Sequence, residues 1–347
     1  MIYLIAWSTI LGALILSRWQ GPLSKAAVIS AGGVVTCVAV LRGGVGTDTE
    51  SYEYWAGAVR TGAGLAGAEP GFGALLNALT WIFESDQTVI RAVSLIYALL
   101  ILVAYRNSEK DERFLLLAFV VPAYFFLHSM NVLRLGLASA ILILAAQNLR
   151  HQRVARFWLL GVLAMAFHYT SVAPLIFLWL MTSGGHGLKG RAIAIVATAL
   201  AGAFLFFSQD WLGDKSQAYG DLQAPDELSG LSQLVILAFL LSAVAVSRLG
   251  FLTKSRLILA SGLLATGGWM AARQSYAGLR ALDLIVFVVP LSFIVASGIE
   301  GLRLNDKAKL LLIIAGIASV GAQFRGFVLN EGSGATPFLP YYSLFSD

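Results

Sequence analysis

The sequence predicts an all-α, polytopic integral membrane protein with about 11–12 transmembrane or re-entrant helices. Hydrophobic residues make up 58% of the 347 residues and charged residues only 12%, and the mean hydropathy is +0.78. Apolar runs in such a chain need lipid around them. The 35 glycines agree with this class, because small residues let transmembrane helices approach closely. Since no repeat or soluble segment divides the chain, we expect a single membrane domain over residues 1–347.

Composition and motifs exclude several function classes. The net charge is +5, but the basic residues lie between apolar runs and not in a basic tract with aromatic residues. Nucleic acid is therefore not an expected partner. Cys37 is the only cysteine, so no intramolecular disulfide is possible. The sequence lacks the usual metal-binding and nucleotide-binding motifs, so it predicts neither a metal site nor a cofactor.

The first two apolar runs set the orientation of the chain. Residues 2–17 have no small-residue cleavage site after them, so we expect a retained helix. The linker that follows holds Arg18 and Lys25, and the second run covers residues 26–41. Short basic loops stay on the cytoplasmic side, which places this linker inside and residues 42–87 outside.

The outer region 42–87 contains one short apolar segment, residues 72–83. As a helix of about 12 residues it is only ~18 Å long, shorter than the ~30 Å hydrocarbon core. We therefore expect it to lie at the outer surface as an interfacial helix. A spanning helix follows at 88–105, and Ser85 and Asp86 suit its N-terminus.

The middle of the chain predicts two helices and a hairpin. Runs 113–127 and 131–149 come first, and the second ends in the basic cluster at 150–156, which belongs inside. Residues 157–181 are apolar but interrupted, and basic residues follow them. A single span would put those basic residues outside, so we prefer a hairpin of two short arms with His168 near its apex.

Five further apolar runs complete the predicted bundle. They cover residues 192–208, 231–247, 257–272, 281–299 and 310–328. The acidic and basic loops between them alternate, which puts loops 209–230 and 273–280 and the tail 329–347 outside, together with loop 42–87. We expect the functional site to be formed by these outer loops.

The outer side gathers most of the polar residues that are able to do chemistry. They include Asp48, Glu69, Arg134, His168, Arg273, Arg280 and the tail tyrosines. Arginine is unexpected on this side, because the positive-inside rule keeps it on the other. These three arginines therefore call for another explanation.

The order and spacing of these motifs resemble those of a known family. The motifs are Gly46-Thr-Asp-Thr with Tyr52, Glu69-Pro-Gly-Phe72, Asn131-Val-Leu-Arg134, Phe167-His168, Arg280 and a terminal Pro-Tyr. Over residues 46–342 they resemble the EpsG-like, Wzy-type polysaccharide polymerases of bacteria. One departure is Leu135, which stands where the family commonly has Gln after the arginine of the Asn-x-x-Arg motif.

The resemblance implies an inner-membrane glycosyltransferase with a GT-C-like helical bundle. Such enzymes join oligosaccharide repeat units carried on undecaprenyl diphosphate, at the periplasmic face. Donor and acceptor would both be undecaprenyl-diphosphate-linked oligosaccharides in the lipid bilayer. A repeat-unit flippase and a chain-length regulator are the implied protein partners.

The implied chemistry gives the arginines and the acid–base residues separate roles. Arg134, Arg280 and Arg273 are candidates for binding the diphosphate, because guanidinium stays charged and offers two parallel N–H donors to phosphate oxygens. The remaining need is a base for the acceptor hydroxyl.

Asp48, Glu69 and His168 are the candidates for that base. We favour His168, because its unperturbed pKa of about 6.5 lies near neutrality. Asp48 would then orient the imidazole. The acidic residues do not stand at metal-ligand spacing, so we expect the transfer to be metal-independent.

Aromatic residues of the outer side are candidates for binding sugar. They are Tyr52, Tyr54, Trp55, Tyr276 and Tyr341. Each offers an apolar face with a polar edge, although tyrosine and tryptophan at a membrane interface also serve as belt residues.

Structural roles are open for most of these residues as well. His168 could hydrogen-bond between helices, and Arg134 could extend to lipid phosphates. Arg273 could be an interfacial anchor. Asp48 could cap the helix that begins near Glu50, and Glu69 could only mark the start of the interfacial helix.

Two other functions are open at this point. An O-antigen ligase-like enzyme, or another glycosyltransferase with a lipid-linked sugar donor, would differ mainly in its acceptor. A lipid-linked oligosaccharide flippase would need charged groups near the membrane midplane that are accessible from both sides. The centres of the predicted helices are almost bare of charge, which favours an enzyme.

Overall fold

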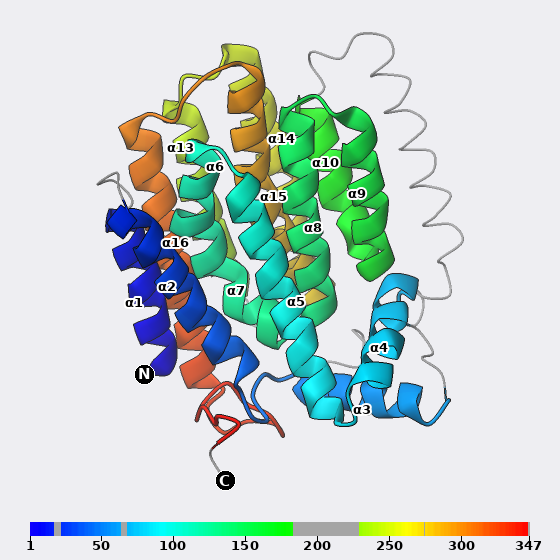
Figure 1. The fold of residues 1–347 in the computed structure, drawn as a ribbon. Coiled ribbons are helices and arrows are strands. Elements are labelled where there is room, and N and C mark those ends of the chain that lie inside the picture. Colours follow the sequence, from blue (N-terminus) through cyan, green and yellow to red (C-terminus); the bar gives the residue numbers. More distant parts are fainter. Residues whose placement is uncertain (17–21, 64–67, 183–228, 274, 346–347) are drawn as a thin grey trace. The chain divides into compact units, whose positions relative to one another are not determined.

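A computed structural model describes residues 1–16, 22–63, 68–182, 229–273 and 275–345. In these ranges the regular secondary structure is helical, apart from one isolated bridge between Arg42 and Ser343, which confirms the all-α prediction (Figure 1). The predicted run 192–208 and nearly all of loop 209–230 lie outside the described residues.

Five of the described helical segments are long and apolar enough to cross a membrane. They are α5 (Asp86–Asn107), the segment Lys110–Met130, α8 (Leu133–Arg150), α15 (Tyr276–Ile299) and α16 (Asp306–Leu329). The described chain also has shorter apolar helices of 10–17 residues, two of them before α5 and three between α8 and α15. This composition is that of a polytopic membrane protein.

The described chain forms two compact units. The first comprises residues 1–144, 159–169 and 316–347, and the second comprises residues 145–158 and 170–315. A single membrane domain over the whole chain stays a prediction.

The first unit contains the N-terminal helices and two short helices in the predicted outer region 42–87. These are α1 (Ile2–Leu16), α2 (Pro22–Val40), α3 (Thr49–Arg60) and α4 (Pro70–Ile82). Helix α3 packs against both α4 and α5, and α2 packs against α1 and α5. The predicted interfacial segment is therefore a separate helix, α4, of 13 residues.

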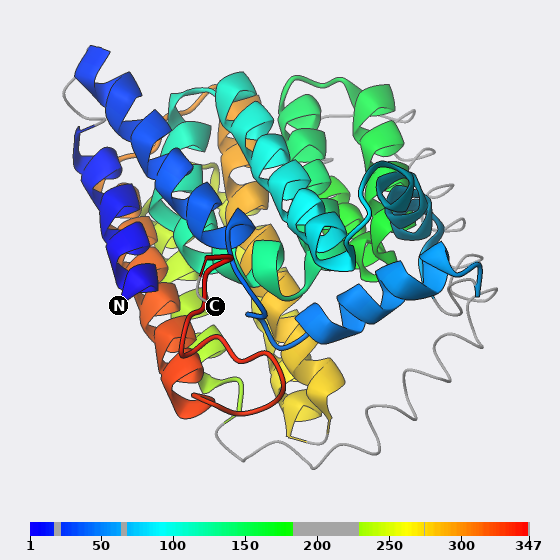
Figure 2. The same cartoon turned by 60° about the horizontal axis from the view of Figure 1, so that its bottom comes forward.

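Aromatic side chains fix the C-terminal tail to the first unit. Tyr3 is fully buried and makes edge-on contacts with Phe126 and Tyr341. Phe338 of the tail stacks on Phe327 of α16, with ring centroids 4.1 Å apart. Each such pair contributes about 0.5–1.5 kcal/mol beyond the burial of its area. The tail consequently runs beside the end of α2 (Figure 2).

The segment Lys110–Met130 is interrupted by a π-helical turn. It consists of α6 (Lys110–Leu115), the π segment Leu116–Val120 and α7 (Val121–Met130). Pro122 has no N–H to donate, so the regular hydrogen bonding cannot continue through this point. The indole of Trp7 donates to the Pro122 carbonyl at 3.2 Å. The predicted break before α8 is confirmed, because α7 ends at Met130.

The second unit is centred on α15. The helices α10 (Val172–Thr182), α13 (Leu231–Val246) and α14 (Phe251–Ala272) all pack against it, and its residues 285–297 are buried throughout. Within this unit Phe157 of α9 (Val154–Phe167) stacks on Trp179 of α10, with ring centroids 5.9 Å apart. The two ends of segment 157–181 therefore lie together, which confirms the predicted hairpin.

Candidate functional site

Three elements of the first unit bring one charged or titratable side chain each to a common point. Glu69 is the N-cap residue of α4, Arg134 lies in the first turn of α8, and His168 directly follows α9. Arg134 Nη1 donates to Glu69 Oε2 at 2.6 Å. His168 Nδ1 lies 2.8 Å from Glu69 Oε1. We call these three residues the Glu69 site.

The sequence around Glu69 explains how its carboxylate reaches His168. Pro70 occupies the first position of α4, where its fixed φ suits the start of a helix. Gly71 then allows α4 to touch α9, because a Cβ on Gly71 would lie 2.8 Å from the carbonyl oxygen of Ala166. The Glu-Pro-Gly motif thus sets the start of α4 against the end of α9.

The charge of the Glu69 carboxylate determines which ring nitrogen of His168 carries a proton. Burial raises the pKa of Glu69, but the hydrogen bond from His168 and the charge of Arg134 outweigh it, and the pKa lies below its ordinary value. Glu69 is therefore ionised near neutrality and can only accept hydrogen bonds. It follows that Nδ1 of His168 carries a proton, and in the neutral imidazole Nε2 is the nitrogen able to accept another.

Arg134 is held inside the first unit from two sides. Its guanidinium lies over the ring of Trp55, 4.7 Å from the centroid. The side chain is only 15% exposed. Its Nε is buried without a hydrogen-bond partner. An arginine that only extended to lipid phosphates would be paired with water and head groups instead. The geometry is that of a positioned cation with a spare donor at Nε.

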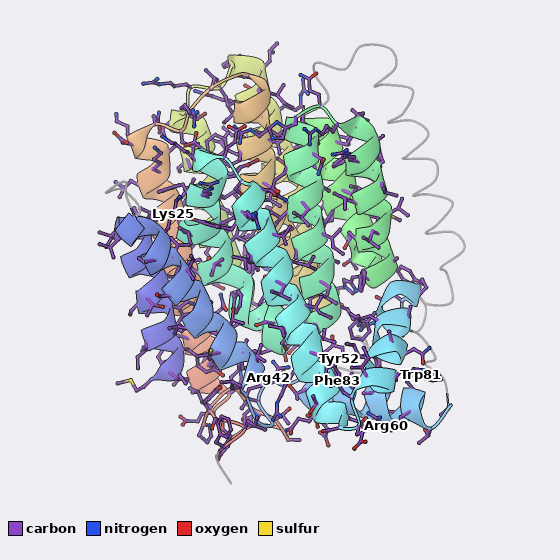
Figure 3. All side chains as sticks on the ribbon, in the orientation of Figure 1. Lys25, Arg42, Tyr52, Arg60, Trp81 and Phe83 are labelled. Atoms are coloured by element: carbon purple, nitrogen blue, oxygen red, sulfur yellow. The ribbon has the colours of Figure 1, made fainter. Side chains whose placement is uncertain are left out.

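Aromatic residues of α3 and α4 form one wall of the Glu69 site. Tyr52, Trp55 and Phe72 contact one another with ring centroids 5.6–6.2 Å apart. Figure 3 labels Tyr52 on α3. Burial raises the pKa of Tyr52, and the nearby Arg134 opposes this only in part. The phenol therefore stays neutral and can donate a hydrogen bond.

Asn131 fixes the loop that carries Asp48. Its Oδ1 accepts from Thr47 Oγ1 at 2.7 Å and from the Asp48 backbone N–H at 2.8 Å. Gly46 has φ +106°, and a Cβ there would lie 2.2 Å from the carbonyl oxygen of Met130. Only glycine fits this position without displacing the backbone.

Asp48 itself occupies the N-cap position of α3, but its side chain makes no capping hydrogen bond. The sequence suggested Asp48 as the group that orients His168. In the structure the carboxylate on Nδ1 is that of Glu69. Asp48 lies near enough to Tyr52 to affect the pKa of the phenol.

The other predicted residues belong to the second unit or are not among the contacts that define the Glu69 site. Arg273, Tyr276 and Arg280 belong to the second unit, where the guanidinium of Arg273 lies 4.1 Å from the ring centroid of Trp269. Tyr54 is 74% exposed on α3. A part in the site for these four residues stays a prediction.

Tyr341 lies in the first unit, and its hydroxyl donates to the carbonyl oxygen of Val38. Among the described residues, no three His, Cys, Asp or Glu side chains gather as metal ligands would. The sequence did not indicate that Glu69 joins Arg134 and His168, or that Asn131 fixes a loop.

Comparison with known proteins agrees with the motif order. A sequence model of the EpsG family matches residues 25–343, a range that includes every residue of the Glu69 site. Neither curated proteins nor solved structures give a match to this chain.

Proposed function

Because this chain belongs to the EpsG family, a family of the polysaccharide polymerase type, we propose that the Glu69 site joins lipid-linked oligosaccharides. Family membership and the long apolar helices indicate a multi-pass membrane glycosyltransferase. The finer proposal is that the donor is an oligosaccharide on undecaprenyl diphosphate, and that the acceptor is a sugar hydroxyl of a second lipid-linked repeat unit. The reaction would take place at the periplasmic face of the bacterial inner membrane.

The proposed step is one displacement. The acceptor hydroxyl oxygen forms a bond to the anomeric carbon of the donor sugar, and the bond between that carbon and the diphosphate oxygen breaks. The electron pair of the broken bond leaves with the undecaprenyl diphosphate. The hydroxyl proton passes to a base. No oxidant, reductant or cofactor is needed for this balance.

Each member of the Glu69 site has a role in this step. Nε2 of His168 takes the hydroxyl proton, since Nδ1 is occupied by the contact with Glu69. The N–H donors of Arg134 that Glu69 does not use stabilise the charge that develops on the leaving diphosphate. Glu69 positions both and is too acidic to be an effective base near neutrality.

One observation carries the proposal. A single buried carboxylate contacts both a cation suited to phosphate and a ring nitrogen of an imidazole. An arginine and a histidine in separate packing roles would not need a common partner. The aromatic wall formed by Tyr52 and Trp55 supports binding of sugar at the same place.

We also propose that the transfer is metal-independent, because Arg134 supplies the charge that a metal ion would otherwise provide. A part for Arg280 or Arg273 in diphosphate binding belongs to the same proposal. A repeat-unit flippase would supply the substrate, and a chain-length regulator would act on the product.

The test is the lipid-linked glycan profile of a strain that lacks this protein. We expect the loss of polymer and the accumulation of single lipid-linked repeat units at the periplasmic face. Restoring the wild-type gene should reverse both, and His168→Ala should not. Persistent lipid-linked polymer with failure of its final transfer would instead show a ligase, and repeat units retained at the cytoplasmic face would show a flippase.

A further inference from the structure

A second charged cluster lies in the first unit, at the same end of α5 as α3. It consists of Arg42 after α2, Glu53 on α3, Arg91 on α5 and Tyr341 of the tail, and we call it the Arg42 cluster. Figure 3 labels Arg42 in this region, close to the beginning of α5. None of the proposed steps at the Glu69 site uses these residues.

The two arginines are built into the fold. Arg91 Nε donates to the carbonyl oxygen of Arg42 at 2.9 Å, and Arg42 Nη1 donates to the carbonyl oxygen of Ser129 at 3.1 Å. Arg42 is 1% exposed, whereas Arg91 is partly exposed. The tail closes one side of the cluster, since Gly43 N–H donates to the Tyr342 carbonyl oxygen at 2.8 Å.

The charges of the Arg42 cluster are not balanced by direct contacts. Both arginines lie near enough to Glu53 to lower the pKa of its carboxyl, although burial has the larger effect and raises it. Within the described residues neither arginine forms an ion pair with Glu53. Arg42 Nη2 and Glu53 Oε1 are both buried without a hydrogen-bond partner.

The unpaired buried atoms of the Arg42 cluster lower the stability of the fold. Two guanidinium groups face one carboxylate, and burial lowers the pKa of Arg42 to about 10. An unpaired buried polar atom normally costs about 1–3 kcal/mol. Arg60, on the same helix as Glu53, shows the ordinary arrangement: it donates to Asp86 twice and to the carbonyl oxygens of Thr80 and Phe83.

The side chains of the Arg42 cluster indicate the chemistry of a ligand that would pair with them. Two arginines favour a phosphate or diphosphate. The Glu53 carboxylate favours a hydroxyl donor beside that anion. The phenol of Tyr341 lies near both arginines, and a tyrosine ring suits contact with a sugar. A sugar attached to diphosphate offers an anion and hydroxyl groups together.

We infer that the Arg42 cluster binds the diphosphate and first sugar of the lipid-linked acceptor. This inference rests on the proposed function, in which the acceptor keeps its own diphosphate while the donor loses one. Two diphosphate groups are then present during each transfer, and Arg134 serves only the leaving one. Helix α3 carries residues of both sites, with Tyr52 facing the Glu69 site and its neighbour Glu53 facing the Arg42 cluster.

The first experiment measures binding of inorganic diphosphate to the full-length protein in lipid nanodiscs by calorimetry. We expect two diphosphates per wild-type chain, and one for either Arg91→Gln or Arg134→Gln. The affected site should weaken by about 10- to 100-fold, which is the loss of one or two charge-assisted hydrogen bonds. Arg60→Gln is the matched control and should keep both sites.

The second experiment compares two acceptors in a transfer assay. One is the lipid-diphosphate-linked repeat unit, and the other is the same oligosaccharide without lipid or diphosphate. Arg91→Gln should raise KM for the first acceptor by about 10-fold or more and leave the second unchanged. In the binding experiment, Glu53→Gln removes a negative charge from the Arg42 cluster and should tighten the binding of inorganic diphosphate.

The outcomes separate this inference from the proposed function. If wild-type protein transfers sugar, but Arg91→Gln keeps both the diphosphate stoichiometry and the acceptor preference, the Arg42 cluster is structural and the inference is wrong. If wild-type protein transfers no sugar to either acceptor, it is the proposed function that is wrong. Loss of acceptor preference in Arg60→Gln as well would also overturn the inference.

Discussion

The substitution Glu69→Gln tests the geometry of the Glu69 site most directly. It keeps the size of the side chain and removes its charge. An ionised carboxylate accepts from both Arg134 and His168, whereas an amide has one oxygen and one NH₂ group. One of the two contacts must then place a donor against a donor, unless His168 changes tautomer, so that Nε2 carries the proton and is no longer the nitrogen that accepts one.

The expected effects on stability and on catalysis differ in size. The lost charge-assisted hydrogen bond should lower the free energy of unfolding by about 1–3 kcal/mol. A positioned general base contributes about 10²- to 10⁴-fold to a rate, so misorienting His168 should lower kcat by a similar factor. The mutant should therefore be folded and nearly inactive.

The pH dependence follows from the same group. The pKa of Glu69 is below its ordinary value of 4.5 in the folded protein. Its stabilising contribution is therefore present above that value and is lost as the pH falls through the lowered pKa. Stability of the wild-type protein should fall in this acidic range more steeply than that of Glu69→Gln.

The assay is single-turnover transfer between purified lipid-linked repeat units, with thermal unfolding measured on the same samples. Glu69→Asp is the control, because it keeps the charge with a shorter reach and should retain part of the activity. Transfer by Glu69→Gln within about twofold of wild type, at normal folding, would refute the role given to Glu69. So would equal pH dependence of stability in the two proteins.

Three further predictions rest on individual contacts. Gly71→Ala should push α4 away from Ala166, lower the free energy of unfolding by about 1–3 kcal/mol and abolish transfer. The control is Gly12→Ala, whose added methyl group meets no atom within 4 Å. It should leave thermal unfolding nearly unchanged. Trp55→Leu should remove a cation–π contact of about 0.5–2 kcal/mol with Arg134 and weaken inorganic diphosphate binding at the Glu69 site, while Trp55→Phe should keep most of it; equal affinities would contradict the contact. Polymerisation by purified protein should continue in EDTA, and inhibition that magnesium or manganese reverses would show that the transfer needs a metal.

Much of the fold follows from local sequence. The sequence predicts a helix start within residues 85–88, with Asp86 suited to the N-terminus. In the structure the helix begins at Asp86, and the hydroxyl of Ser85 accepts from Thr88 N–H. The break at His168 was predicted because a single span would have broken the charge alternation of the loops. Hydropathy and loop charge are local properties, so the sequence displays them directly.

Helix boundaries were less accurate where polar residues extend a helix. Helix α14 begins at Phe251, although the apolar run suggests 257. Its polar first turns are held by Glu300, which accepts from Gly250 N–H and Thr253 Oγ1. Both contacts come from one residue about 50 positions away in the sequence, and hydropathy contains no information about them.

The site was predicted in part for the same reason. The sequence placed Glu69, Arg134 and His168 on one side and gave each a chemical type. Their pairing joins residues 65 and 99 positions apart, and it depends on the contact between Gly71 and Ala166. The sequence also contains a signal for the Arg42 cluster, because Arg42 is another arginine in the region 42–87 that is predicted to lie outside.

The shared carboxylate has a consequence for the charge balance of the reaction. In the proposed step, the Glu69 site starts with one anion, one cation and an uncharged imidazole. When His168 accepts the hydroxyl proton, the site gains one positive charge as the departing diphosphate gains one negative charge. The two changes offset each other within the same enclosed group, so little charge has to be compensated by solvent. Resetting the site then requires that the imidazolium give up its proton, and the released diphosphate is a group able to accept it.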